Sequence, residues 1–204
     1  MKYLLASLFG LFSLFGSVFA QEISPDALVQ QVTDDVLTIV RQDKDIQSGD
    51  TVKALKLVET KVLPYFDFQR MTALAVGRNW SKATPEQKQR LSEEFKTLLV
   101  RTYSNALTSY KDQTTSYRPS QIEAGETDVI VKTEVRQPGS KPIPLNYALQ
   151  KQSGGWKVYD VMVSGVSLVT NYRGSFANEV RSNGIAGLIQ MLSDRNKKLA
   201  SANT

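Results

Sequence analysis

The sequence contains neither cysteine nor histidine, and these two absences exclude several kinds of site at once. Without cysteine the chain forms no disulfide and has no thiolate chemistry, and without histidine it lacks the most common general base. Most zinc sites and the Cys-His and Ser-His-Asp nucleophile systems are therefore excluded. A phosphate-cradling glycine loop, a Gly-x-Ser-x-Gly motif and a His-Glu-x-x-His motif are also absent from the sequence.

The distribution of charge argues against another class of function. The chain carries 25 Lys and Arg residues against 20 Asp and Glu residues, a formal net charge of +5. The basic residues are spread among acidic ones instead of forming a patch, which argues against nucleic-acid binding. A mildly basic protein suits anionic surfaces, although a solvated charged face explains the same composition.

The N-terminus has the pattern of a signal peptide. A short start with one lysine precedes an apolar run over residues 4–20 that contains no charge. The run is shorter than the ~20 residues of a spanning helix, and it ends in a small-x-small sequence, Val18-Phe19-Ala20. We expect residues 1–20 to be cleaved and residues 21–204 to form a single exported domain. An uncleaved membrane anchor is the alternative; no cysteine follows the run, so an acylated lipoprotein is not expected.

The first half of the remaining chain has helical periodicity. Four residues that favour helix N-termini each precede an apolar stripe at helical spacing: Ser24, Asp50, Asp67 and Thr84. Thr84 and Gln87 form a capping box. The helix from Asp50 is expected to reach Pro64, and the long helix after Thr84 is expected to reach Tyr110. Gly77 is expected to end the short helix after Asp67.

The period changes to strand-like alternation after residue 111. "TDVIVKTEVR", "IPLNYALQK" and "WKVYDVMV" predict three antiparallel strands separated by turns, and "TTSYRPSQIE", with its proline, predicts an edge strand. Helical patterns return at residues 168–180 and 185–199, separated by Asn183-Gly184. This order predicts an α+β fold: a helical layer packed on a curved antiparallel sheet, cone-like and NTF2-like, enclosing an apolar pocket. A cone of this kind is either filled by side chains or left hollow for a ligand.

Asp160 and three tyrosines are the polar candidates inside such a cone. In cone-shaped α+β isomerases an aspartate can act as a base, and "VYDVMV" places Asp160 on a strand. The ordinary interpretation is a carboxylate at the outer face or rim of the sheet, paired with a lysine or arginine. Tyr103, Tyr147 and Tyr172 could donate hydrogen bonds to a ligand, or they could bond to nearby backbone.

Three segments resemble a known family. "VLPYFDFQRMTALAVGRNW", "ATPEQKQRLSEEFKTLLVRTYSNAL" and "GGWKVYDVMVSGVSLVTNYRGSF" occur in the order found in the MlaC, or toluene-tolerance, family of periplasmic phospholipid-binding proteins. The resemblance covers nearly the whole exported chain. Its most distinctive parts are Pro-x-Phe-Asp-Phe from Pro64, Gly-Arg-x-Trp from Gly77, and residues 156–161 leading to Gly-Val-Ser at Gly165.

The resemblance implies a soluble periplasmic carrier without cofactor, metal or catalytic residue. Such a protein moves phospholipid between an outer-membrane lipoprotein complex and an inner-membrane ABC transporter with a membrane-anchored substrate-binding subunit, and so maintains lipid asymmetry. We expect a monomer that makes transient contacts with these membrane proteins and binds no nucleic acid. The family holds acyl chains in a deep apolar pocket between helices and sheet, with the head group near the mouth.

Thirteen residues are predicted to line that pocket, because apolar periodicity and the family's pocket-forming segments coincide at them: Phe66, Met71, Ala75, Phe95, Leu98, Leu99, Val131, Tyr147, Leu149, Val163, Leu168, Val169 and Phe176. Periodicity alone does not separate a pocket wall from the core behind it. The aromatic-rich segment over residues 62–80 is interpreted as pocket wall and lid, with ordinary core as the alternative. Glycines at 77, 165, 174 and 184 either end helices and form turns or let the helical layer move against the sheet.

Two other functions remain open at this stage. The first is an envelope protein that binds other small hydrophobic compounds or peptides. The second is a cone-fold enzyme that uses Asp160 with a tyrosine, against which the missing histidine and the lack of a second nearby carboxylate both argue.

Overall fold

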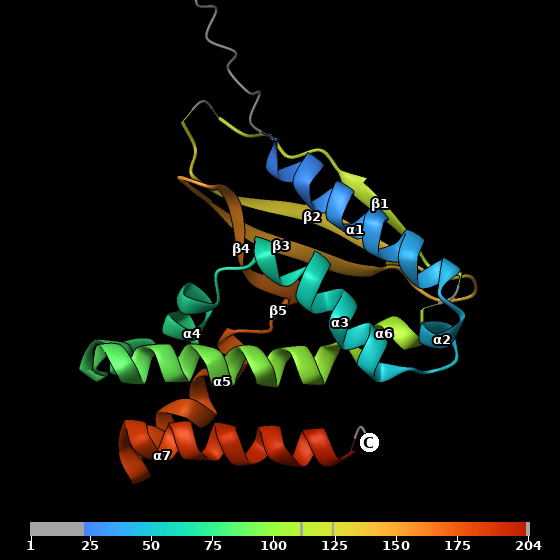
Figure 1. Ribbon diagram of the computed structural model, residues 1–204. Coiled ribbons are helices and arrows are strands. Elements are labelled where there is room, and N and C mark those ends of the chain that lie inside the picture. Colours follow the sequence, from blue (N-terminus) through green and yellow to red (C-terminus); the bar gives the residue numbers. More distant parts are fainter. Residues whose placement is uncertain (1–22, 111, 124, 203–204) are drawn as a thin grey trace, which may run out of the picture.

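A computed structural model describes residues 23–110, 112–123 and 125–202. It shows helices and a five-stranded antiparallel sheet, which confirms the predicted α+β class (Figure 1). The predicted signal peptide, residues 1–20, lies outside the described residues. Helix α1 runs along the sheet in Figure 1, while α5 and α7 lie together as a separate helical body.

The sheet is a simple meander in which each strand pairs with the next along the chain. All four pairings are antiparallel, and a bulge shifts the register of β3 against β4 between Ala148 and Leu149. A bulge adds one unpaired residue and bends the strand, which curves the sheet. The strands are β1 (Thr114–Arg118), β2 (Asp128–Arg136), β3 (Ile143–Gln152), β4 (Gly155–Val163) and β5 (Val166–Ser167).

Each of the four predicted helix starts is confirmed by a side-chain cap. Ser24, Asp50 and Asp67 each accept a hydrogen bond from the backbone N–H three residues on. Thr84 and Gln87 form both bonds of the capping box. The helices are α1 (Pro25–Gln42), α2 (Lys44–Gln47), α3 (Thr51–Lys61), α4 (Phe68–Val76), α5 (Pro85–Tyr103), α6 (Asn105–Thr108) and α7 (Arg173–Ala202), with 3₁₀ turns η1 (Leu63–Tyr65), η2 (Gly77–Lys82) and η3 (Thr170–Tyr172).

Several predicted boundaries were wrong. The helix after Thr84 ends at Tyr103, and buried Ser104 separates it from α6, so Leu107 and Tyr110 pack against α1–α3 instead of continuing the stripe. The helix after Asp50 ends before the turn η1, which contains Pro64. The predicted edge strand stops at Arg118, before its proline. The last helical region begins with η3 at Thr170, not at Leu168.

Three predicted glycine positions adopt backbone angles that favour glycine. Gly77 ends α4 with φ of 61°, Gly165 forms the turn between β4 and β5 with φ of 83°, and Gly184 breaks α7 with φ of 70° and ψ of −175°. The break at Gly184 confirms the predicted separation of two helical stretches. Gly174 lies within α7 and is not among the positive-φ glycines.

The buried apolar residues form three clusters. The first, called here the helical cluster, joins α4, α5, η3 and α7. The second, the sheet cluster, joins β2, β3 and β4 to the first turns of α1. The third joins the end of α1 to α2, α3 and α6. The elements around the sheet cluster are called here the sheet body, and those around the helical cluster the helical body; the third cluster belongs to neither. The predicted pocket would lie between the two bodies.

Candidate functional site

One face of the sheet presents a continuous apolar surface. Residues directly opposite one another on antiparallel strands point to the same side, so Tyr147 shares a face with Val131 on β2 and Val161 on β4. Leu149 extends this face in one direction, and Leu145 extends it in the other. Leu149 and Val131 are fully buried, whereas Leu145 and Tyr147 are half-buried. The surface is therefore closed at one end and partly accessible at the other.

Helix α1 covers the closed end of this face. Leu28 and Val29 pack in the sheet cluster, and Val32 lies against it one turn further on. The residues of α1 were missing from the predicted wall, although their helical spacing was visible in the sequence. Their apolar stripe showed that α1 packs on something apolar, but spacing alone does not identify the surface on which a helix packs.

Tyr147 supplies a polar group within this apolar surface. Burial raises the pKa of its hydroxyl to about 12, and a hydrogen bond with the Thr33 side chain lowers that pKa only in part. Nearby, the Tyr117 hydroxyl donates to Asp34 Oδ1 at 3.1 Å. Burial, followed by the negative charge of Asp34, raises the pKa of Tyr117 as well. Both hydroxyls therefore stay protonated at neutral pH and can act as hydrogen-bond donors.

The helical body holds seven of the thirteen predicted wall residues. Phe95 packs edge-on against Tyr172 and Phe176, with ring centroids 5.1 Å and 5.3 Å apart. These contacts fill the space between α5, η3 and α7. The seven are all buried among themselves in the helical cluster: Met71, Ala75, Phe95, Leu98, Leu99, Val169 and Phe176.

The other six predicted wall residues lie toward the sheet. Val131 and Leu149 are buried members of the sheet cluster, and Tyr147 and Leu168 pack against it. Val163 is half-buried and lies opposite Leu145 at the accessible end of the apolar face. Phe66 differs from all the others because it packs against both the sheet cluster and the helical cluster. The sequence thus identified apolar positions on both bodies, but it could not assign them to one common cavity.

Residues 64–70, called here the clasp, connect the two bodies around Phe66. The backbone N–H of Asp67 donates to Val158 O at 2.8 Å, and Lys157 Nζ donates to Pro64 O at 2.6 Å. Gln152 Nε2 also donates to Asp67 Oδ2 at 2.7 Å. Asp67 therefore caps α4 with one carboxylate oxygen and anchors it to the sheet with the other.

Arg70, at the other end of the clasp, also contacts the sheet. Its guanidinium lies 3.6 Å from the centre of the Tyr159 ring and forms an ion pair with Asp128 at 2.7 Å. Its Nη1 is buried and has no hydrogen-bond partner within the described ranges. The clasp is thus held to the sheet by a mixture of backbone, charged and cation–π contacts, in contrast to the apolar packing inside each body.

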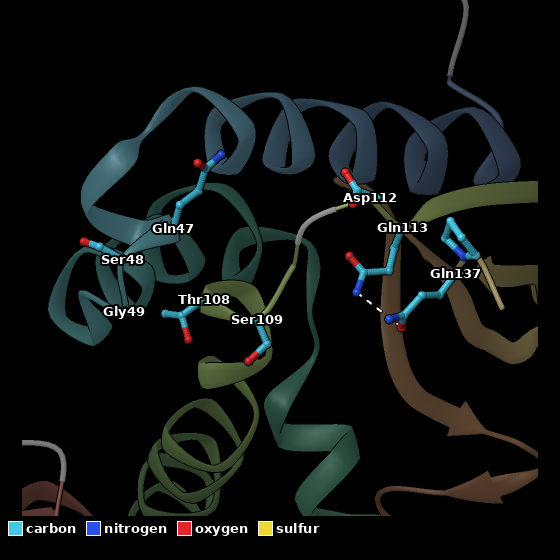
Figure 2. Close-up of a pocket in the computed structure, with 9 residues that line it drawn as sticks. Gln47, Ser48, Gly49, Thr108, Ser109, Asp112, Gln113 and Gln137 are labelled. Atoms are coloured by element: carbon cyan, nitrogen blue, oxygen red, sulfur yellow. Dashed lines mark hydrogen bonds between the residues drawn. The ribbon is translucent and has the colours of Figure 1, made fainter. Parts of the chain in front are cut away.

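Among five of the surface hollows in the described part of the chain, one is lined by a predicted wall residue, Phe66. Phe66 and Phe68 stack at 5.8 Å and form the apolar side of a hollow of about 600 Å³, whose lining also includes Lys88, Glu93 and Lys96. Figure 2 shows a different hollow, where polar side chains of α2, α6 and the loops beside the sheet gather and Gln113 reaches Gln137. Its lining is too polar to hold an acyl chain.

Asp160 is buried and fully engaged by its neighbours. Its Oδ1 accepts from the backbone N–H of Val161 at 2.8 Å and of Val169 at 3.3 Å, and its Oδ2 accepts from Ser167 Oγ at 2.5 Å. Asp160 therefore bonds to these donors and not to the lysine or arginine that the ordinary interpretation predicts. The carboxylate holds the β4–β5 turn against η3, which is a structural use of the residue.

The described part of the chain offers no grouping of three or more acidic, histidine or cysteine side chains that could hold a metal ion. Within the same residues, no helix combines the length and apolar character needed to cross a membrane. The candidate site is the apolar face of the sheet, within which Tyr147 supplies a hydroxyl.

Comparison with known proteins agrees with this picture. The family model described as MlaC protein matches residues 30–194. The chain is 41% identical to the phospholipid-binding protein of Ralstonia solanacearum, whose structure was solved in complex with a phospholipid; the match has a TM-score of 0.81 and covers 87% of this chain and 99% of that one.

Two curated relatives are more distant. The toluene tolerance protein Ttg2D of Pseudomonas putida is 28% identical over 79% of this chain and 75% of its own length. The intermembrane phospholipid transport system binding protein MlaC of Haemophilus influenzae is 27% identical over 82% of this chain and 80% of its own length. The resemblance drawn from the three sequence segments is thus confirmed, and the chain belongs to the MlaC family.

Proposed function

We propose that this protein is a periplasmic phospholipid carrier, and that it shuttles lipid between outer-membrane and inner-membrane components of a transport system that maintains lipid asymmetry. The observation that carries the proposal is the 41% identity, over nearly the whole fold, to a protein solved with phospholipid bound. The name of the Haemophilus influenzae relative supports the transport role. The inner-membrane partner would be an ABC transporter with an anchored substrate-binding subunit, and the outer-membrane partner a lipoprotein complex.

The physical requirement for such a carrier is a large apolar surface. Each methylene withdrawn from water contributes ~0.8 kcal/mol, so two acyl chains of about 15 methylenes represent on the order of 20 kcal/mol. A lipid that leaves a bilayer needs a compartment of comparable apolar area. The apolar face of the sheet, with Val131, Tyr147 and Leu149 at its centre, supplies part of that area.

We assign the contact with acyl chains to the sheet side of the predicted wall and to Phe66. Leu145, Tyr147 and Val163 are half-buried, so their side chains can gain contacts when a ligand enters. The seven members in the helical cluster pack against one another and would form the support behind the pocket. An empty pocket would expose a large apolar area, so we expect the unloaded protein to close.

Mass spectrometry of freshly purified protein tests the carrier function. Native spectra should show a bound mass that organic extraction removes, and the extract should contain glycerophospholipid. A fully folded protein from fresh cells that carries no lipid would refute the proposal. An extract that contains another hydrophobic compound would support the alternative function, an envelope binder of small hydrophobic molecules.

The structure gives less support to the other alternative, an enzyme that uses Asp160. Both oxygens of Asp160 accept hydrogen bonds from groups that belong to the fold, which leaves the carboxylate poorly placed to take a proton from a substrate.

A further inference from the structure

A groove on the helical body combines an apolar floor with unneutralised positive charge. It lies between η2 and the first half of α7, has a volume of about 720 Å³, and extends to the break at Gly184. Val76, Val180 and Ile185 are the larger apolar residues in its lining. Four cationic side chains also line it, and all four are exposed: Arg78, Lys82, Arg173 and Arg181. The lining contains no acidic residue.

Neutral oxygen atoms, not carboxylates, hold three of these cations. Arg173 Nε donates to Leu74 O at 3.1 Å, and Lys82 Nζ donates to the Asn79 side-chain oxygen at 3.2 Å. Arg181 donates to the side-chain oxygen of Asn178 at 2.5 Å. Within the described ranges, none of the four cations forms an ion pair with a carboxylate. Three of the four cations are therefore oriented without being neutralised.

The local backbone contributes to this arrangement. Gly77 adopts φ of 61° at the end of α4, and a Cβ there would lie 3.9 Å from Cδ and Nε of Arg173. The arginine thus lies across the glycine and reaches the carbonyl of Leu74 near the end of α4, where a cation is favoured by the helix dipole. This contact fixes one side of the groove.

We propose that this groove docks an acidic, amphipathic segment of a protein partner during loading or delivery of lipid. The inference rests on the carrier function and names the chemistry of the partner surface. Apolar side chains of the segment would enter the floor between η2 and α7, and its carboxylates would meet the four cations at the rim. Charge complementarity of this kind speeds encounter and fixes the docked orientation.

The shape of the groove favours a protein segment over a bilayer surface. Val180 and Ile185 are partly buried and give the groove its accessible apolar surface, whereas Val76 is only 2% exposed. A flat anionic membrane could reach the exposed cations but not this recessed floor. A segment with projecting apolar side chains can reach both, because side chains on one face of a helix extend into a groove.

The test measures binding of a defined peptide to the protein in the form in which it is purified from cells. The probe is a synthetic helical peptide with leucine at positions i, i+3, i+4 and i+7 and glutamate elsewhere; its control has glutamine in place of every glutamate. Backbone amide shifts of the ¹⁵N-labelled protein locate the binding site, and fluorescence anisotropy gives the affinity at two salt concentrations. Sedimentation with phosphatidylcholine vesicles that contain phosphatidylglycerol tests the membrane alternative.

The decisive variant is Arg78→Glu with Arg181→Glu, because neither side chain anchors the backbone of another element. Its matched control is Lys44→Glu with Lys56→Glu, which makes the same change of charge at exposed positions far along the chain on α2 and α3. We expect the groove variant to bind the glutamate peptide on the order of tenfold more weakly, while the control changes little. A peptide with lysine in place of glutamate should bind the groove variant better than the wild type.

Three outcomes would overturn the inference. They are equal binding by the groove variant and its control, amide shifts that map outside the groove, and vesicle binding that depends on Arg78 and Arg181 without peptide binding. Lipid content of both variants is measured by mass spectrometry in parallel. Normal lipid content with no peptide binding refutes the docking groove alone, whereas absence of lipid from the wild type refutes the carrier function.

Discussion

Replacement of Asp160 distinguishes a structural carboxylate from a catalytic base. In Asp160→Ala, Ser167 Oγ and the buried backbone N–H of Val169 both lose their acceptor. A hydrogen bond to a charged group contributes about 1.5–3 kcal/mol, and a buried donor left without a partner costs about 1–3 kcal/mol. Relief of the buried charge offsets part of this loss. We therefore expect the free energy of unfolding to fall by about 3 kcal/mol.

The measurement is urea denaturation together with thermal unfolding. For a domain of this size, a loss of about 3 kcal/mol lowers the melting temperature by roughly 6–12 °C. Asp160→Asn keeps one acceptor oxygen in place and should lose about half as much. Ser167→Ala serves as a control, because it removes one of the same bonds and should not add fully to Asp160→Ala in the double variant.

The reasoning would be refuted by a melting temperature of Asp160→Ala within about 2 °C of the wild type, well short of the change expected for the loss of buried hydrogen bonds. A catalytic base predicts the opposite pattern. In that case Asp160→Asn would fold normally and lose a measurable turnover that the wild type has.

Three further predictions concern the wall and the clasp. Burial raises the pKa of Tyr147 to about 12, above the value of about 10 in the unfolded chain. The neutral hydroxyl therefore contributes about 2–3 kcal/mol of stability below pH 10, and this contribution is lost as the pH rises through 12. The free energy of unfolding of Tyr147→Phe should fall less than that of the wild type over the same pH range. A β-bridge joins Phe66 and Val158, and bridged backbones lie about 4.8 Å apart, which is within the range for a disulfide. Oxidation of the double variant Phe66→Cys with Val158→Cys should therefore fix the clasp to the sheet and slow lipid uptake. Ala75 is fully buried in the helical cluster, so Ala75→Trp should lower stability by about 1–3 kcal/mol and keep bound lipid.

Each of these has its own control and contrary result. Tyr103→Phe, at an exposed tyrosine, controls for loss of a hydroxyl, and identical alkaline curves for Tyr147→Phe and the wild type would contradict the first prediction. The reduced form of the double-cysteine variant controls for loss of Phe66, and equal uptake in both redox states would show that the clasp need not move. Unchanged stability with lost lipid in Ala75→Trp would place this residue in the pocket wall.

The local features of the fold were predictable because their causes are local. A cap depends on one side chain and the backbone three residues on, so Ser24, Asp50, Asp67 and Thr84 could be identified without knowledge of the rest of the chain. The alternation of β2 is likewise visible in its burial, because Val129, Val131 and Thr133 are buried while the residues between them are exposed. The break at Ser104 was missed because the apolar stripe continues past it, and its cause is a contact of the following residues with distant helices.

The candidate site was harder to predict for two physical reasons. A helical stripe looks the same whether it faces another helix or a ligand, so the members on α4 and α5 could not be separated from core. On β4, a strict alternation puts Val158 and Val161 on opposite faces. The register shift against β3 places both on the same face, opposite Leu149 and Tyr147. One inserted residue reverses the parity of a strand, and the sequence does not mark where it occurs.

Besides the connection from α5 through α6 to β1, the chain passes between the two bodies at two places, and polar groups hold both. At the first crossing, Phe66 touches both cores while Asp67 and Arg70 bond to the sheet around it. At the second, Leu168 packs in the sheet cluster and the next residue lies in the helical cluster, with Asp160 bonded across the step. Separating the bodies would break these polar contacts, of which the bond from Val169 to Asp160 is buried, and the packing of Phe66, whereas opening either core would expose many buried apolar side chains. Local opening follows the region with the fewest buried apolar contacts, so we expect lipid to enter between the bodies, with the clasp as the moving part.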